Sequence, residues 1–167
     1  WLVTSFRDNK LWVVNNSTGE KRELQRPVQY RNDTCFTLYS RHPDTIYFLG
    51  RGSLLTWLPK LNQWGKINFD LQRNSIITCM DIDSDGNYWV GTKRRGLLVY
   101  NPATKTIWMP DSKMFDPNII PVLKYDDKNH YMWIATHNSG LYKYSFAEKK
   151  FIRIRRYDDS PTALHSS

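Results

Sequence analysis

The chain has 167 residues, with 24 Lys and Arg against 16 Asp and Glu, and a formal net charge of +8 at pH 7. Its longest apolar runs are about five residues, whereas a helix that crosses a bilayer needs about 20, so none of these runs is long enough to span a membrane. The positive charge would suit acidic ligands, but the basic residues are scattered along the chain and accompany no nucleic-acid motif. We interpret them as solvated surface and predict no nucleic-acid partner for this chain.

Short β-strands joined by tight turns are predicted along the whole sequence, and no segment has a helical period. Residues 1–24 supply three strands, and a polar linker follows at 25–32. The next unit ends in an outer strand at 63–71, and the outer strand of the last unit is expected at 151–155. The clearest unit, at 74–110, should hold strands at 76–83, 88–92, 97–100 and 106–109, because its turns are rich in Asp, Gly, Asn and Pro.

These units repeat. Trp1, Tyr47, Trp89 and Trp133 recur at spacings of 46, 42 and 44 residues, each followed by a short apolar or Gly-Thr stretch. A period in the forties with about four strands per unit is typical of a β-propeller blade. Because both faces of a blade pack against neighbours, the recurring aromatic residue is predicted to be core, and Gly91 and Gly96 to serve packing and a turn.

The repeated residues resemble a known family. The pattern I-x-x-I-x-x-D-x-x-G-x-x-W-[IV]-G-T-x-x-x-G-L-x-x-Y-[ND]-P-x-T is similar to the regulator-propeller repeat of bacterial hybrid two-component sensors, typical of gut Bacteroidetes. The match is specific at Asp83 to Lys105 and good at Asp127 to Tyr144. It is partial at Trp1 to Lys21 and weak at Asp33 to Trp57, where Leu49-Gly50 replaces Gly-Thr.

The predicted fold is all-β: a partial propeller of about four blades, each a four-stranded antiparallel sheet. The resemblance implies a larger propeller, usually of seven blades, of which this chain would be a piece; alternatively, two copies would close a ring. The expected boundaries are an incomplete blade at 1–24, a divergent blade at 33–72, further blades at 74–110 and 118–156, and a linker at 157–167.

Neither a metal site nor a cofactor is predicted. Asp81, Asp83, Asp85 and Gly86 spell the opening of a calcium loop, but the twelfth position is Thr92 where a calcium loop has Glu. A plain β-turn is the preferred interpretation. The two cysteines, Cys35 and Cys79, fall in first strands of different blades and are expected to be buried free thiols. The four histidines show no zinc spacing, and no nucleophile elbow or paired-carboxylate motif is present in the repeats.

A ligand site is hypothesised on one face of the propeller. Turns between second and third strands share that face with the linkers between blades, around the mouth of the central channel. Cations and amides beside an aromatic residue would suit a carboxylated or sulfated sugar. Alternatively, these are ordinary exposed turn residues, since turns favour polar side chains. The candidates are Lys93, Arg94, Arg95, His137, Asn138, Arg51, Arg7 and Phe115, with Asn9 and Asp116 beside them.

The resemblance implies a function in signalling. The chain would be part of the extracytoplasmic, periplasmic sensor propeller of an inner-membrane hybrid two-component protein that senses glycans or their breakdown products. Its partners would be other blades, a membrane-proximal domain and a second copy in a homodimer. This part would not be an enzyme, and a histidine kinase would lie elsewhere in the protein. The alternatives are an interaction or dimerisation scaffold without a small-molecule site, and a propeller lyase or glycosidase.

Overall fold

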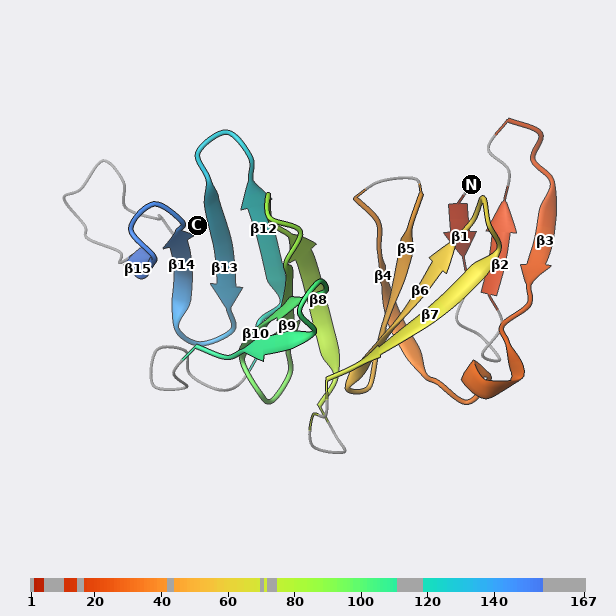
Figure 1. Ribbon diagram of the computed structural model, residues 1–167, viewed down its shortest axis with the longest axis horizontal. Helices are drawn as coiled ribbons and strands as arrows, with labels where there is room; N and C mark the ends of the chain where they lie inside the picture. The colour runs from red at the N-terminus through yellow and green to blue at the C-terminus, as the bar shows by residue number, and fades with distance from the viewer. Residues whose placement is uncertain are drawn as a thin grey trace.

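The computed structural model describes residues 2–4, 11–14, 17–41, 44–69, 71, 75–110 and 119–154, and these residues form four antiparallel β-sheets. The sheets follow one another along the long axis of the molecule, from β1 near one end to β15 near the other (Figure 1). One sheet has three strands and the other three have four each. The prediction of an all-β chain built from blade-like antiparallel sheets is confirmed.

Each sheet is built from consecutive strands. The first contains β1 (Leu2–Thr4), β2 (Leu11–Val14) and β3 (Lys21–Leu24). A short 3-10 helix (Val28–Tyr30) leads to β4 (Cys35–Tyr39), β5 (Ile46–Gly50), β6 (Ser53–Leu58) and β7 (Gln63–Asn68). The third sheet has β8 (Ile77–Ile82), β9 (Tyr88–Thr92), β10 (Leu97–Asn101) and β11 (Thr106–Trp108). The fourth has β12 (Val122–Asp126), β13 (Tyr131–Thr136), β14 (Gly140–Ser145) and β15 (Lys150–Ile154).

The first strands of successive sheets lie side by side. Strand β4 contacts β8, and β8 contacts β12, whereas the fourth strands β7, β11 and β15 are the far edges of their sheets. Sequential strands that run outward from a shared inner row are the arrangement of propeller blades around an axis. The inner row therefore lies where the channel of a propeller would be.

Three hydrophobic clusters lie between the sheets, one at each junction. The first junction contains Val13, Phe48 and Trp57, and the second contains Leu49, Val90 and their neighbours. The third contains Trp89 and Ile134, packed between the sheets of β8–β11 and β12–β15. Because both faces of a middle sheet are covered, its strands read as nearly continuous apolar runs in the sequence.

Neighbouring residues of a repeat face opposite junctions, as period-2 alternation requires. Trp89 faces the following sheet and is 2% exposed, whereas Val90 faces the preceding sheet and is fully buried. Tyr47 is also buried against the sheet that follows it. The prediction that the recurring aromatic residue is core is confirmed for Trp89 and Tyr47. Its counterpart Trp133 is half-buried, because among the described residues no sheet follows its own.

Gly91 lies tightly packed between its partner strand β8 and the segment that enters the next sheet. A Cβ built at this position would lie 2.5 Å from Cys79 Sγ and 2.8 Å from the carbonyl oxygen of Ile120, in the segment that enters the next sheet. Real Cβ atoms do not approach so closely, so the inter-sheet distance here requires Gly. Its assignment as a packing glycine is confirmed.

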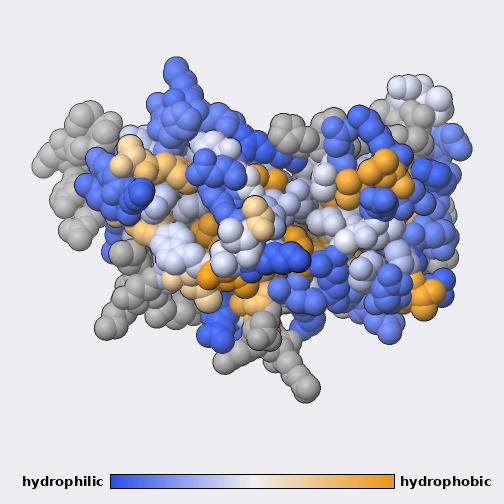
Figure 2. All heavy atoms as spheres, viewed as in Figure 1, coloured by the Kyte–Doolittle hydropathy of each residue, from blue (hydrophilic) through white to orange (hydrophobic). Residues whose placement is uncertain are grey.

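The surface is mostly hydrophilic on the face seen in Figure 2, with hydrophobic residues gathered near the middle of the molecule. The described residues contain no helix that is long and apolar enough to cross a membrane. Cys35 is buried in β4, Cys79 is half-buried in β8, and both thiols are free, so the expected burial holds fully for Cys35 alone.

Candidate functional site

The turns between second and third strands are built by the repeated Thr and Gly. Thr92 Oγ1 donates to the carbonyl oxygen of Gly96 at 3.0 Å and accepts from the backbone N–H of Arg95 at 2.9 Å. Thr136 Oγ1 donates in the same way to Gly140 at 2.8 Å. Gly96 and Gly140 have φ of 65° and 82°, the left-handed region that Gly enters at little cost. The repeated hydroxyl is therefore used to shape the turn.

These turns form backbone hydrogen bonds with the segments that join the sheets. The backbone N–H groups of Gly52, Lys93 and His137 donate to the carbonyl oxygens of Ser75, Ile76 and Ile119, at 2.9, 2.9 and 3.0 Å. Strand-two to strand-three turns and inter-sheet linkers therefore share one edge of the stack, the lower edge in Figure 1, as the sequence predicted.

Six of the eight predicted site residues lie exposed on these turns. Arg51 follows β5, and its guanidinium lies 5.5 Å from the ring centre of Phe36. His137 follows β13, with Nδ1 2.8 Å from Oδ1 of Asn138. The other three are Lys93, Arg94 and Arg95, between β9 and β10. The remaining candidates, Arg7 and Phe115, lie outside the described residues, as do Asn9 and Asp116.

Asp83, the Asp of the repeat, accepts a hydrogen bond from Trp89, the Trp of the repeat. The Asp83 carboxylate is 5% exposed and accepts from Trp89 Nε1 at 2.8 Å, and from the backbone N–H groups of Asp85 and Asn87 at 3.0 and 2.9 Å. The Asn87 side-chain amide donates to the same carboxylate at 3.0 Å. The turn is thus closed by side-chain bonds of the kind that Asp favours, and the carboxylate is saturated by donors.

The Asp81 side chain does not join this turn and instead lies among the first strands of the sheets. Its carboxylate, 2% exposed, accepts from the Tyr39 hydroxyl on β4 and from the backbone N–H of Tyr125 on β12, the latter at 2.7 Å. One buried carboxylate on β8 therefore joins the first strands of three successive sheets. Asp81 and Asp83 do not converge on one point, which agrees with the interpretation of the D-x-D-x-D-G run as a plain turn.

Arg41 connects the turns at the other edge of the stack. From the β4–β5 turn, its Nη1 donates to the carbonyl oxygen of Ile82, and its Nη2 lies 2.5 Å from both carboxylate oxygens of Asp127 in the β12–β13 turn. The guanidinium also lies 5.4 Å from the ring centre of Tyr125. Asp127 and hydrogen bonding hold the pKa of Arg41 above its usual range, although burial opposes the shift.

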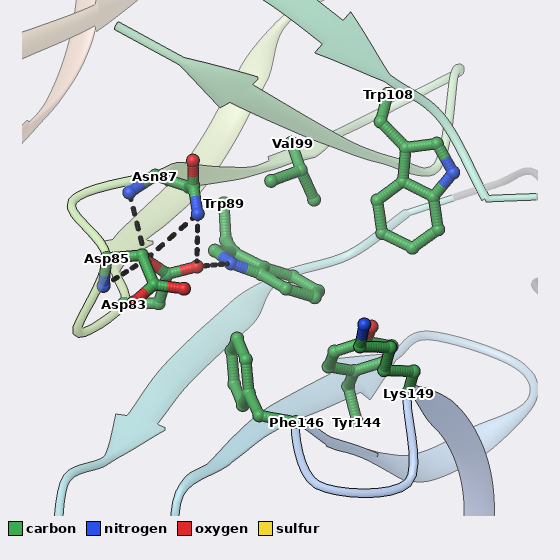
Figure 3. Close-up of a pocket in the computed structure, with 9 residues that line it drawn as sticks. All are labelled: Asp83, Asp85, Asn87, Trp89, Val99, Trp108, Tyr144, Phe146 and Lys149. Atoms are coloured by element: carbon green, nitrogen blue, oxygen red, sulfur yellow. Dashed lines mark hydrogen bonds between the residues drawn. The ribbon is translucent and has the colours of Figure 1, made fainter. Parts of the chain in front are cut away.

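A pocket of about 280 Å³ lies between the third and fourth sheets, on this same edge (Figure 3). Its apolar lining comes from Trp89, Val99, Trp108, Tyr144 and Phe146. Its polar lining comes from Asp83, Asp85 and Asn87 in the β8–β9 turn and from Lys149 in the β14–β15 turn. None of the six predicted site residues that the structure describes lines this pocket, since the cationic turns lie at the opposite edge.

The pKa values of one buried thiol and two tyrosine hydroxyls are raised in the first and second strands of the sheets. Burial raises the pKa of the Cys79 thiol to about 12. Burial, followed by the bond to Asp81, raises the pKa of Tyr39 well above 10.0, and burial with the Tyr88 hydroxyl does the same for Tyr47. These groups are therefore protonated and unreactive near neutral pH.

Sequence reasoning missed the aromatic pocket. Its members come from four strands and two turns of two sheets, so no spacing brings them together. One signal was present in the sequence: Trp108 lies in a predicted outer strand, where an aromatic side chain has few neighbours to cover it. In the structure Trp108 is 47% exposed.

Comparisons with known proteins agree with this architecture. Residues 70–94 match the model of the two-component regulator propeller repeat. Two solved structures of the extracellular domain of BT4673 from B. thetaiotaomicron, described once as a one-component and once as a hybrid two-component system, are similar. They have 21% identity and TM-scores of 0.60 and 0.61, over 84% and 83% of this chain. The extracellular domain of the hybrid two-component system BT3049 from the same organism gives 20% identity and a TM-score of 0.61, over 98% of this chain.

The chain spans only 21%, 20% and 22% of those three structures. No curated protein matches it significantly. At these identities the likeness establishes the fold. The chain therefore carries a two-component regulator propeller repeat and has the propeller fold of those extracellular domains.

Proposed function

We propose that this chain is part of the extracytoplasmic sensor propeller of a hybrid two-component signalling protein in the inner membrane. The observation that carries the proposal is the regulator propeller repeat at residues 70–94, which includes β8 and β9 in the middle of the stack. The histidine kinase and the DNA-binding output would lie in other parts of the protein. In this proposal the blade boundaries are 1–24, 33–72, 74–110 and 118–156, followed by a linker at 157–167.

The proposed signal is a glycan or a glycan breakdown product. Six exposed polar side chains share the edge that would surround the channel mouth, and four of them are cationic: Arg51, Lys93, Arg94 and Arg95. Arginine forks pair with carboxylate and sulfate groups, so this edge supports an acidic sugar as ligand. Binding would shift an equilibrium between two arrangements of a homodimer, to the extent that the ligand prefers one of them.

A scaffold function is the second candidate, and one observation favours it. The outer strand β11 and the residue after it expose three large apolar side chains in a row. Ile107, Trp108 and Met109 are 41%, 47% and 44% exposed. Contiguous exposed apolar residues on a strand edge are typical of a surface that contacts another protein.

The test compares glycan binding by the complete extracytoplasmic region and by this chain, with an array of neutral, uronate-containing and sulfated glycans and a thermal-shift measurement. A glycan that stabilises both would support a pocket within these sheets. Stabilisation of the complete region alone would make this stretch a scaffold.

A variant of the complete region with Arg94→Gln, Arg95→Gln and His137→Gln tests the cationic edge. We expect binding of an acidic glycan to weaken by about tenfold or more, since each lost charge-assisted bond removes part of the affinity. The matched control replaces two exposed cations of the other edge, Lys105→Gln and Lys128→Gln, and should bind normally. Unchanged binding and dimerisation in the triple variant would remove these residues from the proposal.

A further inference from the structure

The pocket between the third and fourth sheets is lined by residues that the structure describes on both of these sheets. Among the described residues its lining comes from residues 83–108 and 144–149, on two adjacent sheets. The surface contains a hollow at a blade junction, away from the cationic turns.

The aromatic wall of the pocket is held in place by its own ring contacts. Trp108 stacks on Phe151 at 21° with ring centres 6.1 Å apart, and it meets Trp89 edge-on at 6.3 Å. Tyr144 packs against the same cluster, 5.1 Å from Trp89 and 6.2 Å from Trp108. Although it is fixed in this way, Trp108 keeps 47% of its surface exposed. The result is a preorganised aromatic surface that a ring-shaped ligand can cover.

The polar rim offers one acceptor and one donor from opposite sides. Asp83 is saturated, as described above, and belongs to the floor of the pocket. The carboxylate of Asp85 and the ammonium of Lys149 are exposed, and within the described residues neither has a side-chain hydrogen bond or ion pair. They come from the β8–β9 turn and the β14–β15 turn, on different sheets (Figure 3).

We propose that this pocket binds one neutral pyranose unit of a glycan. The flat C–H face of a pyranose suits the exposed ring of Trp108, and its hydroxyls both donate and accept, as Asp85 and Lys149 require. A charged sugar would be attracted to one of these groups and repelled by the other. The volume of about 280 Å³ lies just below the usual range of ligand pockets, about 300–1,000 Å³, which fits a single ring. The choice of a sugar as the ring-shaped ligand rests on the proposed function.

The test is a titration of the complete extracytoplasmic region with neutral hexoses and their disaccharides, followed by tryptophan fluorescence and calorimetry, with glucuronate and a sulfated hexose for comparison. We expect dissociation constants on the order of 1 mM for one unit, since the pocket is small and open on one side. Trp108→Ala should weaken binding at least about tenfold. The matched control is Ile107→Ala, its exposed neighbour on β11, which does not line the pocket and should bind within about twofold of the parent.

A second variant keeps the proposal testable if Trp108→Ala fails to fold. The substitutions Asp85→Asn and Lys149→Gln together change only exposed side chains and should weaken binding severalfold without altering thermal unfolding. Neutral-sugar binding that survives both variants but is lost with Arg94→Gln, Arg95→Gln and His137→Gln would overturn this pocket and leave the proposed function standing. Binding of charged sugars alone, independent of Trp108, would do the same. Absence of binding to any sugar would overturn both the pocket and the glycan part of the proposed function.

Discussion

Each repeated residue of the third sheet has a structural role of its own. Asp83 anchors the indole of Trp89, Gly91 permits the next sheet to approach, and Thr92 closes the turn that follows. The corresponding turn of the fourth sheet is closed in a similar way, since the Asp126 carboxylate accepts from the backbone N–H groups of Lys128 and Asn129 at 3.1 Å and from the Asn129 side-chain amide at 2.8 Å. The repeated residues therefore form the hydrogen bonds and the close packing that allow one blade to stack on the next.

Asp83→Ala should destabilise the fold. The substitution leaves the buried Trp89 N–H and two turn N–H groups without their acceptor, and bonds to a charged group each stabilise by about 1.5–3 kcal/mol. We expect the free energy of unfolding to fall by about 2–3 kcal/mol, measured by urea denaturation. Asp85→Asn, in the same turn but exposed, is the control and should change stability by less than about 0.5 kcal/mol. Equal stability of the two variants would contradict the anchoring role.

Gly91→Ala tests the close approach of the sheets. The added methyl group would overlap Cys79 Sγ on β8 of the same sheet and the Ile120 carbonyl oxygen in the segment that enters the next sheet. Both neighbours must shift, at a cost of about 2–3 kcal/mol. The repeat counterpart Ala135 already carries a methyl group, and Ala135→Gly should cost only about 0.5–1 kcal/mol through backbone entropy. Thermal and urea unfolding of both variants measure the difference. A tolerated Gly91→Ala would mean that the junction is looser than the structure shows.

At the scale of elements, successive sheets are joined at the inner strands by side chains as well as by apolar packing. Asp81 connects β8 to β4 and β12, and Arg41 connects the turns of the second, third and fourth sheets. Such ties resist rotation of one sheet against the next more than apolar contacts do, because hydrogen bonds are directional. A signal that passes through these sheets would therefore move them together.

A double-mutant cycle on Arg41 and Asp127 measures the tie between the second and fourth sheets. Arg41→Ala alone should cost about 1–2 kcal/mol, because it also removes the bond to the Ile82 carbonyl and the contact with Tyr125. The coupling with Asp127→Ala should be at most about 1 kcal/mol, because the Asp127 side chain is 70% exposed. The coupling should shrink in 1 M salt, where charges are screened within about 3 Å. A coupling of zero at low salt would show that the pair does not join the sheets in solution.

For the whole molecule, the raised pKa values of Cys79, Tyr39 and Tyr47 predict that the free energy of unfolding falls at alkaline pH. An unfolded chain releases the Cys79 proton near pH 9.0, whereas the folded protein holds it to about pH 12. Between these values the unfolded state binds fewer protons, so the free energy of unfolding falls as pH rises. Tyr39 and Tyr47 add to the fall above pH 10.0, because their pKa values are also raised.

We expect the Cys79 contribution alone to reach about 1 kcal/mol by pH 10, visible as a falling unfolding temperature between pH 8 and 10. Cys79→Ser is the control. Its hydroxyl can still donate to the Ile120 carbonyl oxygen, as the thiol does at 3.1 Å, but it does not titrate in this range. The variant should show a shallower slope below pH 10, because only Tyr39 and Tyr47 then contribute to it. A parent protein with no slope, or a variant with the same slope, would contradict the protected thiol.

The strands, their faces and the turns followed from residues close together in the sequence. Period-2 alternation put Trp89 and Val90 on opposite faces, and Asp and Gly turns marked where strands end, because both effects operate within a few residues. The same local signals placed Lys93, Arg94, Arg95, Arg51, His137 and Asn138 on turns of one edge. Even in the divergent second sheet, Tyr47 is buried in the core, as its repeat position predicted.

Contacts across the junctions depended on the tertiary structure. Asp81 meets Tyr125 across 44 residues, Arg41 meets Asp127 across 86, and the pocket combines Trp108 with Tyr144 from the next sheet. Each of these depends on the distance and rotation between stacked sheets, which is set by the packing of large side chains around Gly91 and Ile120. The repeat period determines that blades exist, but the side chains that meet between them are determined only when the sheets stack.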